Sequence, residues 1–438
     1  MLKAEHPLGV VFFPAFDWAI SPTHPEREER LLYTQDQLRE EGLFDAEGVS
    51  EHKPVPAERL DIERTHFCFP DVDHVTTHSH LVSAGGAITA ARLVVEGAKE
   101  RAFALVRPPG HHAMKCVRGS RGFCNINMEA VMIEWLREHH GVRRIAIVDT
   151  DCHHGDGTQD IYWHDPDTLF ISLHQDGRTL YPGSGFPYES GGPHAMGRTI
   201  NIPLPPDTSD EGFLMVMDGI VRPILDDFKP ELVINSAGQD NHFTDPITNM
   251  NFSAQGYAQL TERLAPDIAV LEGGYAIQGA LPYVNLGICL ALAGLDYSGV
   301  REPNYDPDAL RQSKRITDYI AELCRQIPDL YFHPRAKPKD GAQVGEWFVR
   351  HKTIFYDTDG FTETQVESLH LCDNCPGTLK IESGVDGVTC LGVEAPVGAC
   401  EHCVNLAHSI AEQAQVKSSY RYVQLIDRPN KDYTRFGF

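Results

Sequence analysis

The chain has 438 residues, of which 42% are hydrophobic and 23% charged, and its formal net charge is −24. This composition is typical of a soluble globular protein with room for one large domain and an accessory region. The negative charge argues against a nucleic-acid partner, because phosphate binding needs clusters of lysine and arginine. It is compatible with a cationic substrate, and equally with a role in solubility alone.

The sequence has no apolar run long enough for a transmembrane helix, so we expect no membrane partner. The first residues lack the pattern of a signal peptide, and a cytoplasmic location is therefore expected. The 11 cysteines are an odd number, and this also argues against a disulfide framework.

Residues 1–300 alternate between strand-like and helix-like segments. Short apolar runs predict buried strands at residues 10–13, 101–106, 144–148, 168–173, 231–234 and 267–271. Apolar residues at helical spacing predict helices at residues 81–99, 127–139, 211–228, 257–264 and 281–295. This alternation predicts an α/β fold with a mainly parallel sheet and helices on both faces.

The composition changes after about residue 300. One more helix is predicted at residues 308–327, followed by a polar, proline-containing linker at residues 333–341. The remainder is expected to be rich in strands and holds five cysteines. We therefore expect a large α/β domain at residues 1–335 and a small C-terminal accessory region at residues 336–438.

The most informative segment is residues 147–157, which continues an apolar strand and ends in a glycine-rich turn. Asp149, Asp151 and His153 alternate, so their side chains are expected on one face. Carboxylate oxygen and imidazole nitrogen suit a catalytic zinc or a similar divalent ion. The alternative is a polar loop with helix-capping aspartates, which we disfavour because so many ionisable groups would repel one another without a cation.

Three other strand ends carry reactive residues: 107–113 with His111 and His112, 235–240 with Asp240, and 271–275 with Tyr275. Each is weak evidence alone, since adjacent histidines also occur as structural pairs. Together with residues 147–157 they form a specific set. It resembles the zinc-dependent histone deacetylase family and the related bacterial acetylpolyamine and acetoin-utilisation deacetylases, over about residues 8–300. Supporting motifs lie at residues 24–30, 84–86, 121–127, 172–174 and 181–185.

The resemblance implies an arginase-like open sheet and a catalytic zinc held by Asp151, His153 and Asp240. Three protein ligands leave the open position that a catalytic zinc requires. The metal would polarise the acyl carbonyl and lower the pKa of its bound water. Tyr275 matches the tyrosine whose hydroxyl stabilises the oxyanion.

The resemblance also assigns the histidine pair. His112 matches the general base, which then protonates the leaving amine, and His111 matches its electrostatic partner. Asp156 would orient His112, and Asp149 would orient His111, through hydrogen bonds.

Potassium sites are implied by the resemblance only. The first would use Asp149 and Ser172, with backbone carbonyls of Asp151, His153 and Leu173. The second would use backbone carbonyls around Tyr162, Asp165 and Thr168.

The same resemblance implies a narrow substrate tunnel. Gly122 and Phe123 match one wall and Tyr181 the facing wall, while Gly273 and Gly274 are expected beside the substrate. The Tyr181 hydroxyl would either favour a polar acyl group or reach solvent, and we favour solvent.

Two further positions bear on access and substrate class. Arg30 matches an arginine of the internal acetate channel, with a surface ion pair to a nearby glutamate as the alternative. Polyamine-selective relatives carry a glutamate near the position of Ile247, which counts against a dedicated acetylpolyamine hydrolase.

Two Cys-x2-Cys pairs in the C-terminal region, Cys372 with Cys375 and Cys400 with Cys403, have the pattern of a structural zinc ribbon. A small strand-rich region has little core of its own, so a metal would stabilise it directly. Free thiols or a redox pair are the alternatives.

The leading hypothesis is a zinc hydrolase that removes acyl groups from lysine side chains of peptides or proteins, or from other N-acyl amines. An acetylpolyamine or other small-molecule amidohydrolase is the alternative of similar chemistry. An arginase-like ureohydrolase with two manganese ions is disfavoured by His111, His112 and Tyr275. A non-enzymatic acyl-lysine reader is disfavoured by the complete set of metal ligands, base and tyrosine. Assembly into a homo-oligomer is left open.

Overall fold

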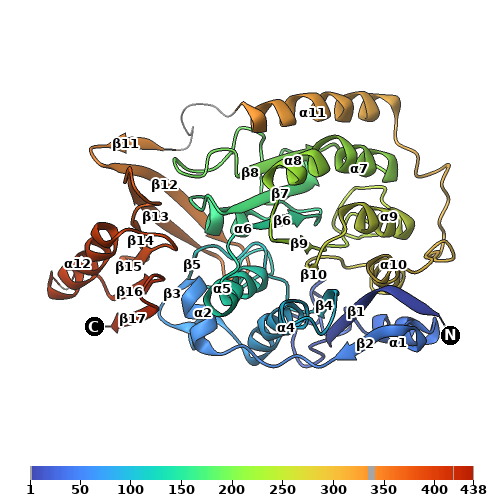
Figure 1. Ribbon diagram of the computed structural model, residues 1–438, viewed down its shortest axis with the longest axis horizontal. Coiled ribbons are helices and arrows are strands. Elements are labelled where there is room, and N and C mark those ends of the chain that lie inside the picture. The colour runs from blue at the N-terminus through green and yellow to red at the C-terminus, as the bar shows by residue number, and fades with distance from the viewer. Residues whose placement is uncertain (1, 334–340, 418, 438) are drawn as a thin grey trace.

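The computed structural model describes residues 2–333, 341–417 and 419–437. Within these residues the chain forms two large sheets, one in each half of the view in Figure 1. A two-stranded ladder of β3 (Phe67–Cys68) and β5 (Cys116–Val117) lies between them.

The first sheet has eight strands in the described residues, all parallel, in the order β2–β1–β4–β10–β9–β6–β7–β8. Most of its strands are buried on both faces, which explains why they read as continuous apolar runs. The strands are β1 (Lys3–Phe13), β2 (Glu47–His52), β4 (Arg101–Val106), β6 (Ile145–Asp149), β7 (Thr168–Gln175), β8 (Thr199–Leu204), β9 (Leu232–Ser236) and β10 (Ile268–Val270).

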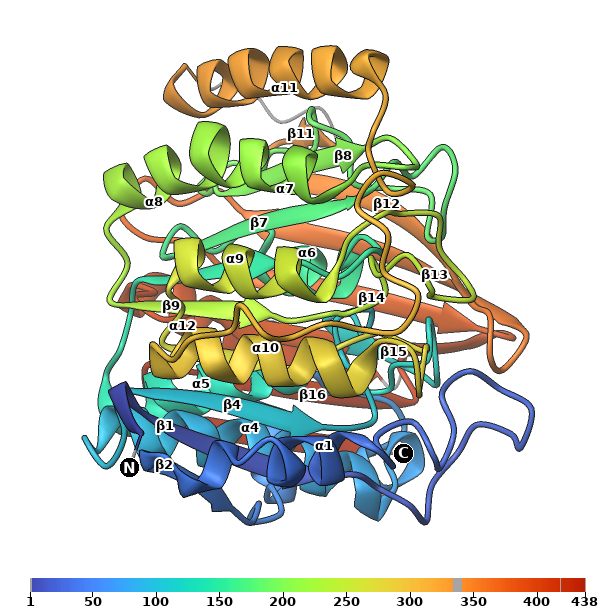
Figure 2. The same cartoon turned by 90° about the vertical axis from the view of Figure 1, so that its right-hand side faces the viewer.

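Helices cover both faces of this sheet (Figure 2), and each face has its own apolar core. One layer contains α2 (Arg59–Thr65), α4 (His78–Val95), α5 (Met128–His140) and α6 (Asp156–Tyr162), with the short α3 (Val72–Val75) nearby. The other contains α1 (Thr34–Glu40), α7 (Asp210–Val216), α8 (Arg222–Phe228), α9 (Ala254–Leu264), α10 (Leu281–Ala293) and α11 (Lys314–Phe332). The open parallel α/β sheet expected from the sequence is confirmed.

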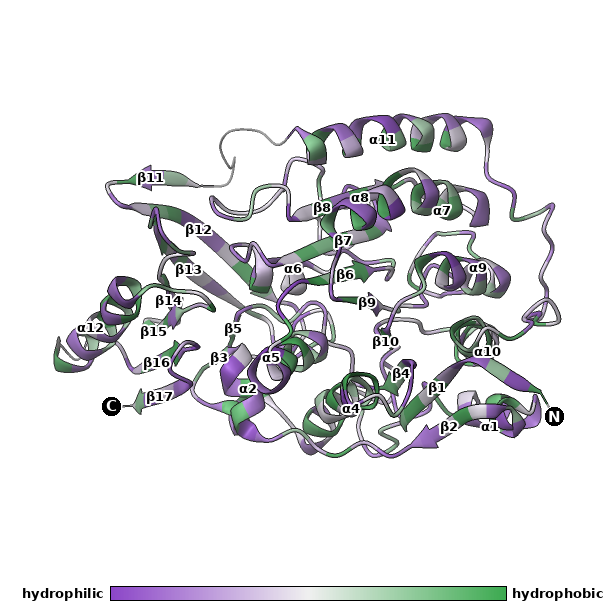
Figure 3. Ribbon diagram, in the orientation of Figure 1, coloured by the Kyte–Doolittle hydropathy of each residue, from purple (hydrophilic) through white to green (hydrophobic). Residues whose placement is uncertain are grey.

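Two predicted helices differ from the observed ones. The segment at residues 211–228 is divided into α7 and α8 by a π-helical turn, Met217–Val221. The last helix begins at Lys314, because the Ser313 hydroxyl caps the amide of Ile316, and not at residue 308. Figure 3 shows alternating apolar and polar bands along α11, whose buried side is formed by Ile320, Leu323, Ile327 and Tyr331.

The second sheet has seven strands in the described residues, in chain order. They are β11 (Ala342–Val344), β12 (Trp347–Tyr356), β13 (Phe361–His370), β14 (Leu379–Val385), β15 (Val388–Ala395), β16 (Tyr422–Asp427) and β17 (Asp432–Gly437). All pairs are antiparallel except β15 with β16, which are joined by α12 (Glu401–Lys417). A parallel pair needs such a crossover. The strand-rich region was predicted, but α12 was not.

The second sheet packs against the first unit through a shared apolar core. Phe67, Phe69 and Cys116 meet side chains of the C-terminal strands there, namely Phe348, Leu369, Leu379, Ile381, Cys390 and Ile426. The predicted linker and the boundary near residue 335 fall mainly on residues 334–340, outside the described residues, so the boundary stays a prediction.

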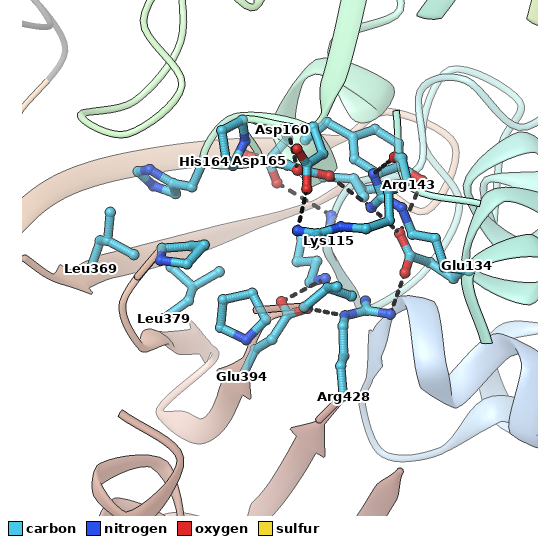
Figure 4. A pocket seen from close by; sticks show the side chains of 18 residues that line it. Lys115, Glu134, Arg143, Asp160, His164, Asp165, Leu369, Leu379, Glu394 and Arg428 are labelled. Carbon is cyan, nitrogen blue, oxygen red and sulfur yellow. Dashed lines mark hydrogen bonds and ion pairs between the residues drawn. The ribbon is translucent and has the colours of Figure 1, made fainter. Parts of the chain in front are cut away.

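Buried ion pairs join the same two units (Figure 4). Lys115 lies 2.7 Å from Glu394, which also pairs with Arg428 at 2.6 Å. Arg428 contacts Glu134 of α5 as well, and these residues line a small cavity of about 60 Å³. Because these side chains are almost fully buried, the charge of Lys115 depends on Glu394 of the other sheet.

None of the helices in the described part of the chain is both long and apolar enough to cross a bilayer.

Candidate active site

Four adjacent strands of the first sheet, β4, β10, β9 and β6, end at one edge. The loops that follow them carry His111 and His112, Tyr275, Asp240, and the pair Asp151 and His153. Ligand sites of parallel α/β sheets form at the carboxyl ends of the strands. Residues far apart in the sequence therefore meet at this edge: His153 contacts Asp240, 87 positions away, and Gly273 contacts Asp151, 122 positions away.

The three predicted zinc ligands come together. One donor atom from each of Asp151, His153 and Asp240 lies within 4.8 Å of the others, and all three residues are buried. His153 Nδ1 lies 2.8 Å from Asp240 and 3.2 Å from Asp151. Burial and the nearby Asp151 carboxylate raise the pKa of Asp240. Two buried carboxylates and one imidazole thus converge on a single point, which is the donor set of a catalytic metal.

The two histidines each have a carboxylate partner, as the resemblance implied. His111 Nδ1 lies 3.0 Å from Asp149, and His112 Nδ1 lies 2.8 Å from Asp156. A carboxylate accepts, so Nδ1 of His112 carries the hydrogen and its Nε2 is available as a base. Burial and the neighbouring His111 lower the pKa of His112 to about 3, which keeps this ring neutral at neutral pH.

Two opposing effects act on the pKa of His111. Burial lowers the pKa of His111, but the carboxylates of Asp151 and Asp149 outweigh it and raise the pKa well above its usual range. The pKa values of the two adjacent rings are therefore shifted in opposite directions, that of His111 upward and that of His112 downward. Such a division is what a base and its electrostatic partner require.

Arg121 holds Asp156 in place, a contact that the sequence did not predict. Its guanidinium binds both carboxylate oxygens of Asp156, and it lies 5.6 Å from the ring centre of Tyr181. Asp156 is thus fixed between Arg121 and His112, so its carboxylate stays charged. The only sequence signal was the arginine immediately before Gly122 and Phe123.

Glu272 and Arg30 hold the loops in place. One oxygen of Glu272 accepts hydrogen bonds from the amides of Gly110, at 2.7 Å, and His111, at 3.0 Å. Arg30 is fully buried, donates to the carbonyl of Gly274 at 2.7 Å, and pairs with Glu26 at 2.6 Å. The surface ion pair considered for Arg30 is therefore wrong, because the pair is buried; the channel function stays a prediction.

Tyr275 lies close to Asp245 and Arg30. Its amide donates to Asp245 at 2.8 Å, and the guanidinium of Arg30 lies 5.0 Å from its ring centre. Burial raises the pKa of Tyr275 well above its usual range, so the phenol keeps its hydrogen and can donate it.

A cavity of about 300 Å³ opens above these groups. Its lining combines the reactive rings with apolar side chains: Pro109, His111, His112, Gly122, Phe123, His153, Leu180, Tyr181, Ile247, Tyr275 and Asp357. The predicted tunnel residues Gly122, Phe123 and Tyr181 are among them. Gly273 and Gly274 lie behind this wall, where the Gly273 amide donates to Asp151 at 2.7 Å.

One lining residue, Asp357, comes from the second sheet. Its Oδ1 accepts hydrogen bonds from the amide of Gly122, at 2.9 Å, and from the hydroxyl of Tyr181, at 3.1 Å. The expectation that the Tyr181 hydroxyl only reaches solvent is therefore wrong. No sequence signal could reveal this contact, because Asp357 lies in a turn between two strands of another sheet, more than 170 residues away in the sequence.

The predicted potassium ligands are also near one another. Asp149 and Ser172 are paired residues of the adjacent strands β6 and β7, and Leu173 follows on β7. At the second location, Arg137 contacts both Asp165 and Thr168 at 2.7 Å. Its guanidinium also lies over the ring of Tyr162, so a positively charged side chain already lies beside all three residues.

The four cysteines of the C-terminal region form a compact cluster. The sulfurs of Cys372, Cys375, Cys400 and Cys403 all lie within 4.8 Å of one another, and those of Cys372 and Cys400 are 3.9 Å apart. A tetrahedral zinc with bonds of about 2.3 Å places its sulfurs about 3.8 Å apart. The observed spacing fits this geometry, and no disulfide occurs among the described cysteines.

Residues 71–285 match the model of the histone deacetylase domain. The chain is 48% identical over 351 residues to a probable deacetylase from Archaeoglobus fulgidus, covering 74% of this chain and 96% of that protein. It is 37% identical over 201 residues to an acetylpolyamine amidohydrolase from Burkholderia pseudomallei, covering 45% of this chain and 57% of that protein.

The fold has a solved counterpart. A crystal structure of the HDA15 HD domain resembles it with a TM-score of 0.63 and 26% sequence identity, over 75% of this chain and 95% of that one. Sequence, fold and the convergence of carboxylates, histidines and a tyrosine lead to one conclusion: the chain is an amide hydrolase that belongs to the histone deacetylase family.

Proposed function

We propose that this enzyme removes acyl groups, such as acetyl, from the side-chain amine of lysine or from related acylated amines, and that zinc is its catalytic metal. The observation that carries the proposal is the convergence of Asp151, His153 and Asp240 beside the His112–Asp156 pair and Tyr275. The family is metal-dependent and acts on acylated amines. Two oxygens and one nitrogen suit zinc and leave a position for water.

The residues around the donor set have distinct duties in this reaction. When bound, the metal supplies Lewis-acid activation of water and of the acyl carbonyl. His112, neutral and oriented by Asp156, takes the proton of the attacking water at Nε2 and returns it to the leaving amine. Tyr275 donates its hydroxyl hydrogen bond to the oxyanion. Phe123 and Tyr181 contact the methylene chain and exclude water from it.

Turnover of a fluorogenic acetyl-lysine peptide, with and without a hydroxamate inhibitor, tests the activity. We expect hydroxamate-sensitive turnover in the wild type. Tyr275→Phe should lower kcat about 100- to 1,000-fold, because it removes one oxyanion donor and little else. Tyr283→Phe on α10, which does not line the cavity, is the matched control and should keep full activity. Near-normal turnover by Tyr275→Phe would contradict the assigned mechanism.

A small acylated polyamine is the second candidate substrate. The Burkholderia pseudomallei relative, named for this activity, supports it. Ile247 speaks against it, since this apolar side chain lines the cavity where a glutamate would bind a distant ammonium. Acetylspermidine assayed beside the peptide separates the two.

We further propose a structural zinc at Cys372, Cys375, Cys400 and Cys403, supported by the closeness of the four sulfurs, which all lie within 4.8 Å of one another. A potassium ion at Asp149, Ser172 and the carbonyl of Leu173 is proposed from the family resemblance.

A further inference from the structure

The turn at residues 357–360, between β12 and β13, reaches from the second sheet to the mouth of the catalytic cavity. It is fixed there by two carboxylates. Asp357 binds the Gly122 amide and the Tyr181 hydroxyl, and Asp359 accepts from the Ser120 amide at 2.6 Å. Only Asp357 lines the cavity. The C-terminal unit thus contributes one charged residue to the active-site rim.

The charge of Asp357 is balanced by no ion pair among the described residues, although Arg121 and His24 interact with it electrostatically at longer range. Among the described residues, no lysine or arginine lies within ion-pair distance of it. Both of its hydrogen bonds go to Oδ1, and Oδ2 has no partner in the described part of the chain. Arg121 is nearby, but its guanidinium is committed to Asp156. Asp357 is exposed, so an incoming substrate can reach its free oxygen.

The rest of the lining cannot replace this charge. Around the mouth the side chains of Phe123, Leu180, Tyr181 and Ile247 are aromatic or apolar. The ionisable groups deeper in the cavity are His111, His112 and His153. A substrate that enters acyl group first therefore leaves its far end beside one fixed negative charge.

We infer that Asp357 is a specificity-determining residue that selects acylated amines carrying a second positive charge outside the cavity mouth. The inference rests on the proposed function. The cation can be a second ammonium of a small polyamine, or a basic side chain next to the acyl-lysine of a peptide. A single exposed charge pair is modest, so we expect about a fivefold preference that weakens with salt.

Two matched substrate pairs test this inference. The first is acetylspermidine against N-acetylbutylamine, which lacks the further ammonium groups. The second is an acetyl-lysine peptide with arginine beside the modified lysine against the same peptide with glutamine there. The variant is Asp357→Asn, which keeps Oδ1 as acceptor for Gly122 and Tyr181. Asp359→Asn removes the same charge from the same turn but does not line the cavity, and is the control.

We expect Asp357→Asn to lower kcat/KM about fivefold for the charged member of at least one pair, through KM, and to leave the neutral members unchanged. Asp359→Asn should change none of these values. The pair that responds identifies the small amine or the basic peptide as the source of the cation.

Three results would overturn the inference: no change in Asp357→Asn, an equal loss on charged and neutral substrates, or the same selective loss in Asp359→Asn. An equal loss would mean that Asp357 only positions Gly122 and Tyr181. If the wild type turns over none of the four substrates, the proposed function itself fails, and the inference fails with it.

Discussion

Gly122 has a left-handed backbone, with φ +52°, and lies against the ring of His112. A Cβ at this position would approach His112 Cδ2 to 2.4 Å, closer than any packing permits. Gly122→Ala should therefore displace the base and lower kcat about 100-fold, since a displacement of about 1 Å can cost that much. Single-turnover assays measure the loss of activity, and a thermal melt measures the loss of stability separately.

Gly141→Ala is the control for backbone strain. Gly141 also has a positive φ, +68°, but no atom lies within 4 Å of its missing Cβ. Both alanines cost about 1–2 kcal/mol of stability for the left-handed conformation. Only Gly122→Ala should lose activity. Equal kcat values in the two variants would show that His112 accommodates the methyl group.

The sequence predicted some residues of the site and not others for a physical reason. Asp151, His153 and Asp240 follow apolar strands within recognisable motifs, so both spacing and resemblance point to them. The contacts of Asp357 with Gly122 and Tyr181 depend on how two units dock. No local pattern encodes such a contact.

The four-cysteine cluster belongs to the scale of elements, because it ties the β13–β14 connection to the start of α12. Purified protein should hold about two zinc ions per chain by elemental analysis. Changing Cys372 and Cys375 together to serine should remove one and lower the unfolding temperature, since structural zinc binding contributes folding energy. Cys390→Ser, buried outside the cluster, should keep both ions. A wild-type value of one ion would contradict the structural zinc.

Elements of the first sheet were predictable because strands buried on both faces must be apolar, as at β4 and β6. The helix α12 was not predicted. It buries alanines and one valine, Val404, Ala407, Ala411 and Ala414, which give only a weak apolar pattern. Its position is set by packing on β15 and β16.

At the scale of the whole molecule, the two units depend on each other. A chain that ends at residue 335 would expose Phe67 and Phe69 and leave Lys115 without its partner Glu394. Breaking a buried pair costs about 3–5 kcal/mol. The fragment should therefore melt roughly 10 °C lower than the full chain, or aggregate. Differential scanning fluorimetry checks this, and equal melting temperatures would show that residues 1–335 are self-sufficient.

The composition change after residue 300 predicted an accessory region. It gave no sign that this region shares an apolar core with the first sheet and its helices. That core joins Phe67 to residues 300 or more positions later, such as Leu369 and Ile426. Contacts of this separation leave no periodicity in either segment.

The turn at residues 357–360 has one more consequence, for how such an enzyme can diversify. The metal ligands and the base lie on loops of the first sheet, where almost any substitution disturbs a buried hydrogen bond. Asp357 and its neighbours in the turn are exposed and belong to a separate sheet. Exchanging this hairpin between relatives would alter the entrance while the chemistry stays intact, so substrate preference and catalytic power can be inherited independently.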